Sequence, residues 1–428
     1  MTVAGLAHSR IVAVRAGRLV DVVAGALLPD VILLIRAERV EAIVAGDSPV
    51  PDGADLIDLT GHTVMPGLID GHSHLIGDLE YADVPAIGMT AEREILVGVH
   101  NAAVTLRAGV TSVRDVGTFR AFLDLELRDA IEDGLVAGPR MQGAGAYVTI
   151  PGGAGEVTGL PGSEVPPEMR FGLVRTPADV RRVVDAICDR GADLIKVLAT
   201  GAVLTRGTEP GRVELDRPML DAAVEAATAR GRYVAAHAHG AEGIKLAVRA
   251  GVRSIEHGSL MDDEAIALMV EHGTYLVADI YNGDWIAAEG LRGGWPAETM
   301  RKNDETTEAQ RVGFRKAVAA GVRVAFGTDS GVYPHGTNAI QLPLMVRHGM
   351  TPLGAVRAAT VVAAEMMGWA DRVGTLSVGH YADLLAVPGD PFEAADGTGL
   401  AALQDPTLVM KGGSVVRDDR RLSEPPGR

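Results

Sequence analysis

The chain has 428 residues, 47% hydrophobic residues, 4% aromatic residues, one cysteine and a formal net charge of −16 from 40 basic and 56 acidic side chains. Because phosphate-rich partners require a basic surplus and base stacking requires aromatic side chains, this composition argues against nucleic acid and anionic membranes as partners. The single cysteine excludes an intramolecular disulfide, no apolar run approaches the roughly 20 residues of a membrane span, and the first residues do not resemble a signal peptide. We therefore expect a cytoplasmic protein.

The two ends of the chain share a β-rich pattern. Three early segments, "RIVAVRAGRLVD", "DVILLIRAERVEAIVAG" and "ADLIDLTGHTVMPG", are rich in Val, Ile and Leu and are broken by Gly and Asp. Near the other end, "ADLLAVPGD" predicts a strand and "TLVMKGGSVVRD" predicts a hairpin that turns through Gly412 and Gly413. We predict one β-sandwich-like domain from residues 1–63 plus 371–428, with a loose tail at 420–428.

The middle of the chain, residues 64–370, alternates short apolar segments with longer helical ones. The expected strands are "TVMPGLIDGHSHL", "VTSVRDVG", "RMQGAGAYVT", "ADLIKVLAT", "RYVAAHAHG", "RSIEHG", "TYLVADI" and "VRVAFGTDSG". Segments such as "RTPADVRRVVDAICDRG" predict the helices between them, and the Gly that precedes a strand is a typical helix stop. Eight such units predict an α/β fold, a (β/α)8 TIM barrel, whose active site lies at the carboxyl ends of the strands.

Metal-ligating side chains stand at several of these strand ends. A single histidine is more often an ordinary core or capping residue, but here the histidines gather at the strand ends. Residues two apart on a strand share a face, so each His-x-His pair points toward the barrel mouth. The candidates are His72 and His74 on the first strand, Lys196 on the fourth, His237 and His239 on the fifth, His257 on the sixth and Asp329 on the eighth.

Lys196 lies in an apolar candidate strand, "ADLIKVLAT", in which Leu194, Ile195, Val197 and Leu198 surround it in the sequence. A buried ammonium ion costs several kcal/mol unless it is paired or discharged. The ordinary explanations are a lysine that reaches solvent at the strand end or a buried ion pair. Beside a metal site a third explanation is possible. A neutral amine can react with carbon dioxide and give a carbamate whose two oxygens bridge two metal ions.

The order His-x-His, Lys, His, His, Asp on these strands resembles the amidohydrolase superfamily of metal-dependent hydrolases. The segments "VMPGLIDGHSHL", "GADLIKVLATGAV", "YVAAHAHG", "SIEHGS" and "FGTDSGVYPHG" are similar to its imidazolonepropionase-like branch, which includes Xaa-Pro dipeptidases and ochratoxin amidohydrolases. The resemblance implies two divalent ions, with zinc expected, and a homo-oligomer. It assigns one ion to His72, His74, Asp329 and a carbamate on Lys196, the other to that carbamate, His237 and His257, and substrate contacts to His239 and His335.

The resemblance also implies a reaction, in which hydroxide held by the ions attacks an amide carbonyl and Asp329 transfers the proton to the leaving nitrogen. The expected substrate is a small amide that carries a carboxylate, such as a dipeptide or an N-acyl amino acid. Ala154 stands where the branch often has histidine, in "TIPGGAGEVTG", and leaves the substrate open. Arg114 and Asp115 are expected to form a structural ion pair.

Three alternative functions follow from the same residues. A carbamate, an arylurea or a cyclic amide could be hydrolysed at the same site. A non-catalytic binding protein that keeps the barrel is disfavoured by the intact ligand set. A nucleotide or phosphate binder would need a phosphate-binding loop, and "PGGAG" lacks the Lys-Ser/Thr ending of one.

Overall fold

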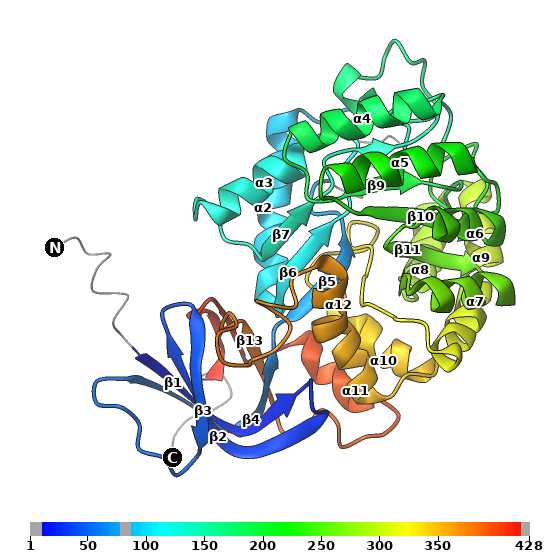
Figure 1. Cartoon of the computed structure of the whole chain (residues 1–428). Helices are drawn as coiled ribbons and strands as arrows, with labels where there is room; N and C mark the ends of the chain where they lie inside the picture. Colours follow the sequence, from blue (N-terminus) through cyan, green and yellow to red (C-terminus); the bar gives the residue numbers. More distant parts are fainter. Residues whose placement is uncertain (1–10, 78–86, 421–428) are drawn as a thin grey trace. The chain divides into compact units, whose positions relative to one another are not determined.

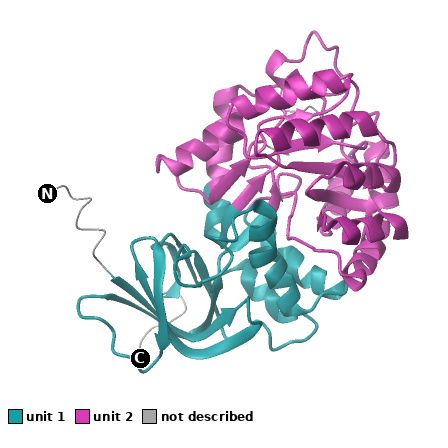
Figure 2. Ribbon diagram, viewed as in Figure 1, with its two compact units in different colours: residues 1–70, 103–112, 336–428 teal, residues 71–102, 113–335 magenta. Residues whose placement is uncertain are grey.

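The computed structural model describes residues 11–77 and 87–420, so most of the predicted tail and the N-terminal segment considered for a signal peptide lie outside the described residues. The chain forms two compact units (Figure 2), one of residues 1–70, 103–112 and 336–428 and the other of residues 71–102 and 113–335. The predicted domain limits at residues 63 and 371 stay a prediction. None of the helices in the described ranges combines the length and apolar composition that crossing a bilayer requires.

The first unit contains a seven-stranded sheet with the strand order β15-β14-β13-β4-β1-β2-β3 (Figure 1). Its strands are β1 (Ile11–Asp21), β2 (Ala26–Arg36), β3 (Arg39–Ala45), β4 (Asp55–Pro66), β13 (Leu384–Pro388), β14 (Leu408–Lys411) and β15 (Ser414–Asp418). Strand β4 runs parallel to β1 and antiparallel to β13, so the C-terminal strands extend the N-terminal sheet. In the described residues these seven strands form one hydrogen-bonded sheet built from both ends of the chain, and the predicted sandwich-like packing stays a prediction.

The predicted C-terminal hairpin is confirmed. Lys411 of β14 pairs with Ser414 of β15, which leaves a loop of two glycines. Gly412 and Gly413 have φ angles of 53° and 73°. Two successive positive φ angles match the backbone twist of a tight hairpin, and glycine adopts them without steric cost.

The remaining strands form a five-stranded sheet of order β12-β11-β10-β9-β8 and a three-stranded sheet of order β5-β6-β7. Neighbouring strands of the larger sheet run parallel, as strand–helix–strand units require. The strands are β5 (Leu68–Ser73), β6 (Val110–Asp115), β7 (Arg140–Gly143), β8 (Tyr147–Val148), β9 (Ile195–Leu198), β10 (Val234–Gly240), β11 (Ser254–Leu260) and β12 (Tyr275–Val277).

The predicted eighth barrel strand, "VRVAFGTDSG", contains only isolated bridge residues. Its backbone nevertheless bonds on two sides: Ala325 N–H donates to Leu276 O of β12 at 3.0 Å, and Gly71 N–H of β5 donates to Phe326 O at 2.9 Å. The segment thus lies between β12 and β5, where an eighth strand would lie. The described strands form separate sheets of mixed α/β architecture, and a closed barrel stays a prediction.

Helices separate most of these strands. Figure 1 shows α4 to α7 following one another outside β9 to β11, and consecutive helices pack side by side. Helix α4 begins with a capping box between Thr176 and Asp179, followed by Pro177 at the first helical position. The α-helices are α2 (Ala91–Arg107), α3 (Leu123–Glu132), α4 (Pro177–Asp189), α5 (Arg217–Ala229), α6 (Ala241–Ala250), α7 (Asp263–His272), α8 (Asn282–Gly293), α9 (Ala297–Ala320), α10 (Gln341–Arg347), α11 (Pro352–Arg357) and α12 (Ala363–Met367). The short helical segments are η2 (Pro167–Arg170), η3 (Asn338–Ile340), η4 (Ala358–Val362) and η5 (Thr398–Gln404).

Candidate metal centre

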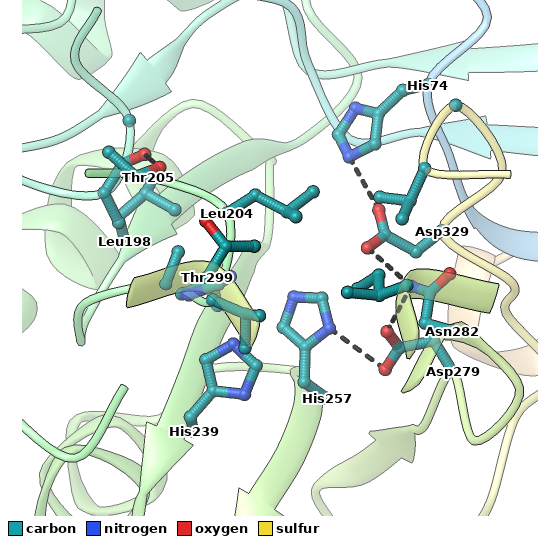
Figure 3. A pocket seen from close by; sticks show the side chains of 18 of the residues that line it. His74, Leu198, Leu204, Thr205, His239, His257, Asp279, Asn282, Thr299 and Asp329 are labelled. Carbon is teal, nitrogen blue, oxygen red and sulfur yellow. Dashed lines mark hydrogen bonds and ion pairs between the residues drawn. The ribbon is translucent and has the colours of Figure 1, made fainter. Parts of the chain in front are cut away.

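The second unit contains a cavity of about 330 Å³ into which the strand ends project. Figure 3 shows His74, His239, His257 and Asp329 turned toward one space, although they come from segments far apart in the sequence. Lys196, His72 and His237 line the same cavity. The structure therefore brings together seven of the eight candidates that the strand ends and the resemblance supplied, all except His335.

The first group of candidate ligands surrounds Asp329. The Nε2 atoms of His72 and His74 lie 3.3 and 3.2 Å from Oδ1 of Asp329. One ligand atom from each residue lies within 4.8 Å of the others. Two imidazole nitrogens and a carboxylate oxygen are a donor set typical of zinc and of related divalent ions.

A second group consists of His237, His239 and His257, whose ligand atoms also lie within 4.8 Å of one another. The rings of His239 and His257 stack, with their centroids 4.7 Å apart. The resemblance implied a substrate contact for His239, but its position among these ligand atoms also suits metal binding. His257 also belongs to a third group with Asp279 and Asp329, so the groups share members.

Outer hydrogen bonds orient three of the histidines. The Nδ1 atoms of His72, His74 and His257 lie 2.8, 2.8 and 3.0 Å from Glu256 Oε2, Gly117 O and Asp279 Oδ1. An acceptor at Nδ1 fixes the proton there and leaves Nε2 free to bind a metal. Sequence reasoning missed Glu256 and Asp279; the only available signal was an acidic residue at or beside a strand end.

The expected ion pair between Arg114 and Asp115 is wrong. Arg114 is fully buried and donates from Nη2 to both carboxylate oxygens of Glu256, at 2.8 and 2.9 Å. Asp115 instead accepts from the backbone N–H groups of Leu75 and Gly117. The reason is the pleat of β6, which turns adjacent side chains to opposite faces.

Lys196 is 2% exposed, so its ammonium group does not reach solvent along the strand. Burial lowers the pKa of Lys196 to about 8, against the opposing influence of the carboxylates of Glu256 and Asp329. Within the part of the chain that the structure describes, no carboxylate oxygen forms an ion pair with its Nζ. Lys196 is therefore buried, has no ion-pair partner among the described carboxylates, and loses its proton more easily than an exposed lysine. These properties suit it to carbamate formation.

The electrostatics at His237, His239 and Asp329 favour metal binding, whereas at His74 and His257, against the opposing effect of burial, neighbouring carboxylates raise the pKa. Burial lowers the pKa of His239 to about 3 and that of His237 well below its usual value, so both rings are neutral near pH 7. Burial alone would raise the pKa of Asp329, but His72 and His74 hold it well below its usual value, so the carboxyl group is ionised. Neutral imidazoles and an ionised carboxylate are the forms that bind metal.

The backbone is unusual at two of the candidate ligands. His257 and Asp329 have φ angles of 68° and 56°, in the left-handed region that non-glycine residues seldom occupy. Such conformations cost free energy and are concentrated at functional sites. At both positions the turn of the backbone directs a ligand side chain into the cavity.

His335 does not line the cavity; its Nε2 lies 3.1 Å from the backbone oxygen of His74. Its predicted substrate contact stays a prediction. Ala154 does line the cavity, and its backbone N–H donates to Glu214 Oε2 at 2.8 Å. The apolar side chains of the outer wall, which sequence reasoning did not find, include Phe119, Tyr147, Leu198, Leu204, Ile286 and Trp295.

Comparisons with known proteins agree with this site. The family model described as "Amidohydrolase family" matches residues 63–416. The ochratoxinase of Aspergillus niger is 32% identical over 413 residues, which cover 90% of this chain and 82% of the ochratoxinase. The imidazolonepropionase of Micrococcus luteus is 24% identical, over 84% of this chain and 88% of that protein. A crystal structure of a Xaa-Pro dipeptidase with bound methionine in its active site superimposes with a TM-score of 0.87 at 35% identity, over 95% of this chain and 99% of that one.

Proposed function

The chain belongs to the amidohydrolase family and is a hydrolase acting on carbon–nitrogen bonds, and from that premise we propose that it cleaves the amide bond of a small substrate carrying a carboxylate. A dipeptide or an N-acyl amino acid is the favoured substrate. The observation that carries the proposal is the pair of ligand groups that share one cavity with the buried Lys196. Relatives named ochratoxinase and Xaa-Pro dipeptidase support the substrate class.

We propose two divalent ions, with zinc expected, bridged by a carbamate on Lys196. His72, His74 and Asp329 would hold one ion, and His237 and His257 the other, with His239 close enough to assist or to contact substrate. When bound, such ions polarise a carbonyl group and lower the pKa of water. The donor chemistry fits, because the three groups offer imidazole nitrogens and ionised carboxylates.

Asp329 is the proposed proton carrier. Its Oδ2 accepts from Nδ2 of Asn282 at 2.9 Å, while Oδ1 faces His72 and His74. Asn282 also donates to Asp279 Oδ2 at 2.6 Å, so one amide group fixes two carboxylates. A carboxylate held in this way can take a proton during attack on the carbonyl and return it to the leaving nitrogen.

The apolar outer wall would hold the body of the substrate. Phe119 and Tyr147 form one edge-to-face pair with ring centroids 5.3 Å apart, and both line the cavity with Leu204 and Trp295. Side chains of this kind exclude water and bury hydrocarbon or aromatic groups.

We further propose that the strands close into a (β/α)8 barrel and that the protein is cytoplasmic and homo-oligomeric.

The test is elemental analysis of protein purified without chelators, combined with a screen of the metal-loaded protein against dipeptides, N-acyl amino acids, carbamates and arylureas. About two divalent ions per chain and turnover of the first two classes would support the proposal. If the protein turned over only carbamates or arylureas, those compounds would replace carboxylate-bearing amides as the proposed substrate class. Metal-loaded protein that turns over none of the four classes would contradict the proposed substrates, with the Asp329→Asn variant as the inactive control.

A further inference from the structure

The loop that follows strand β9, residues 201–212, forms one side of the cavity. Five consecutive residues of this 201–212 loop line it: Ala202, Val203, Leu204, Thr205 and Arg206. Figure 3 shows Leu204 and Thr205 at the same cavity as the candidate metal ligands. A loop at a strand end is where an α/β enzyme contacts the variable part of its substrate.

Hydrogen bonds hold the base and the interior of the 201–212 loop. Thr200 and Val213 form an isolated antiparallel bridge, and Gly201 N–H donates to Arg212 O at 3.1 Å. Inside the loop, the hydroxyl group of Thr208 bonds to both the N–H and the carbonyl of Ala202, each at 3.1 Å. The loop is therefore closed on itself.

Helix α9 fixes the outer part of the loop through Lys302, which is fully buried. The Nζ atom of Lys302 donates to the carbonyl oxygens of Thr205 and Thr208 at 2.8 and 3.1 Å. It also lies 3.2 Å from Oε1 of Glu298, which accepts from Gly207 N–H at 2.8 Å. The backbone on both sides of Arg206 is thus anchored before any substrate binds, which lowers the entropy lost on binding.

Arg206 itself has no such partner. Its side chain is exposed at the cavity, and across residues 11–77 and 87–420 no carboxylate forms an ion pair with it. Its Nη1 lies 3.9 Å from the position that a Cβ on Gly159 would occupy, so the guanidinium faces the loop in which Ala154 lies. The neighbouring Glu298 is already engaged by Gly207 and Lys302.

The other charged groups that line the cavity already have bonding partners or are buried. Glu156 accepts from Gly152 N–H and pairs with Arg170, while Asp279 and Asp329 bond to histidines. Lys196 is buried among the candidate ligands. Among the described lining residues, Arg206 is therefore the one exposed cation, and it stands on a fixed backbone.

We propose that Arg206 binds the carboxylate of the substrate and thereby selects acidic amides over neutral ones. A guanidinium group offers two parallel N–H donors to a carboxylate, and it is more weakly hydrated than an ammonium group, so pairing costs it less solvation. This inference rests on the proposed function, because it names the contact that recognises the carboxylate-bearing substrate.

The test compares two ligands that differ only in the carboxylate, N-benzoyl-L-phenylalanine and N-(2-phenylethyl)benzamide. Their binding to metal-loaded protein is measured by calorimetry in the Asp329→Asn background, where hydrolysis does not interfere. Arg206→Met should weaken binding of the acid by about tenfold or more and leave binding of the neutral amide within twofold. The matched control is Arg212→Met, because Arg212 is an exposed arginine of the same loop that does not line the cavity.

Salt gives a second readout. Affinity for the acid should fall between low and about 0.5 M salt with Arg206 present and should become nearly independent of salt in Arg206→Met. Equal losses for both ligands, no loss for the acid, or the same effect from Arg212→Met would overturn the inference. Because binding is measured without turnover, the inference can fail while the protein hydrolyses amides, and it can hold while the favoured amides prove not to be hydrolysed.

Discussion

Replacing Arg114 by Met tests the buried network that supports His72. Arg114 and Glu256 are both 0% exposed, and Glu256 also contacts His72 Nδ1 at 2.8 Å. Although burial alone would raise the pKa of Glu256, Arg114 and His72 hold it far below its usual value. The substitution would strand an ionised carboxylate in the protein interior, which costs about 3–5 kcal/mol.

The expected size of the effect follows from the unit that contains the pair, which has about 250 residues. At roughly 2.1 cal/mol/K per residue its unfolding entropy is about 0.5 kcal/mol/K, so about 3–5 kcal/mol corresponds to a fall in Tm of about 6–9 °C. Differential scanning calorimetry of the metal-free protein at pH 7 measures this directly. Metal affinity should also fall by about 10- to 100-fold, because Glu256 would no longer be held against His72.

The double variant Arg114→Met/Glu256→Gln separates a stranded charge from lost packing. It removes the carboxylate as well, so it should recover at least half of the lost Tm. The depressed pKa of Glu256 stabilises the wild type above the unfolded value near 4.5, and this stability is lost as the pH falls. The difference in Tm between the wild type and Arg114→Met should therefore become smaller below about pH 4.5. A Tm within about 1 °C of wild type at pH 7, or a double variant no more stable than the single one, would refute the reasoning.

Three further predictions concern the cavity itself. Asp329→Asn should keep the fold and at least one metal ion but lose about 10²- to 10⁴-fold in turnover, measured by steady-state kinetics, because an amide cannot carry the proton; near wild-type turnover would exclude the role. Ala154→His should change the ranking of substrates in a screen without changing metal content, because Ala154 lines the cavity wall; equal effects on every substrate would count against a specificity role. Lys196→Ala should lose both metal content, by elemental analysis, and activity, and acetate or propionate should restore part of each by supplying two oxygens; loss of stability without any rescue would leave Lys196 a purely structural residue.

The periodicity of the sequence located the strands from β9 to β12, because each is a short apolar run that follows a helix stop. It could not show that the segment near Phe326 would form isolated bridges rather than a regular strand, since both have the same apolar pattern. Nor could the periodicity decide whether the C-terminal strands β13 to β15 form a second sheet or extend the sheet of the N-terminal strands. That outcome depends on β13 pairing with β4 across more than 300 residues of chain, as in the register of Leu384 with Pro66.

The candidate site was more predictable than the groups around it. His72 and Asp329 stand at strand ends in a recognisable order, so their meeting followed from the fold. Glu256 and Asp279 escaped notice because an acidic residue next to a histidine has no distinctive pattern, and their role appears only when distant strands are brought together. Arg206 escaped for a related reason: its significance is that the neighbouring carboxylate of Glu298 already bonds to Gly207 and Lys302, which no linear pattern reports.

The place of β4 in the seven-stranded sheet has a consequence for synthesis on the ribosome. Its neighbour β13 is translated about 320 residues after β4 ends, which takes roughly 16–64 s at about 5–20 residues per second. Throughout that interval the backbone of residues 62–66 is an open edge that another nascent copy can pair with. Until β13 is made, the early strands can therefore pair with other chains. Chains that terminate before residue 384 are expected to aggregate even though every candidate metal ligand has already been made.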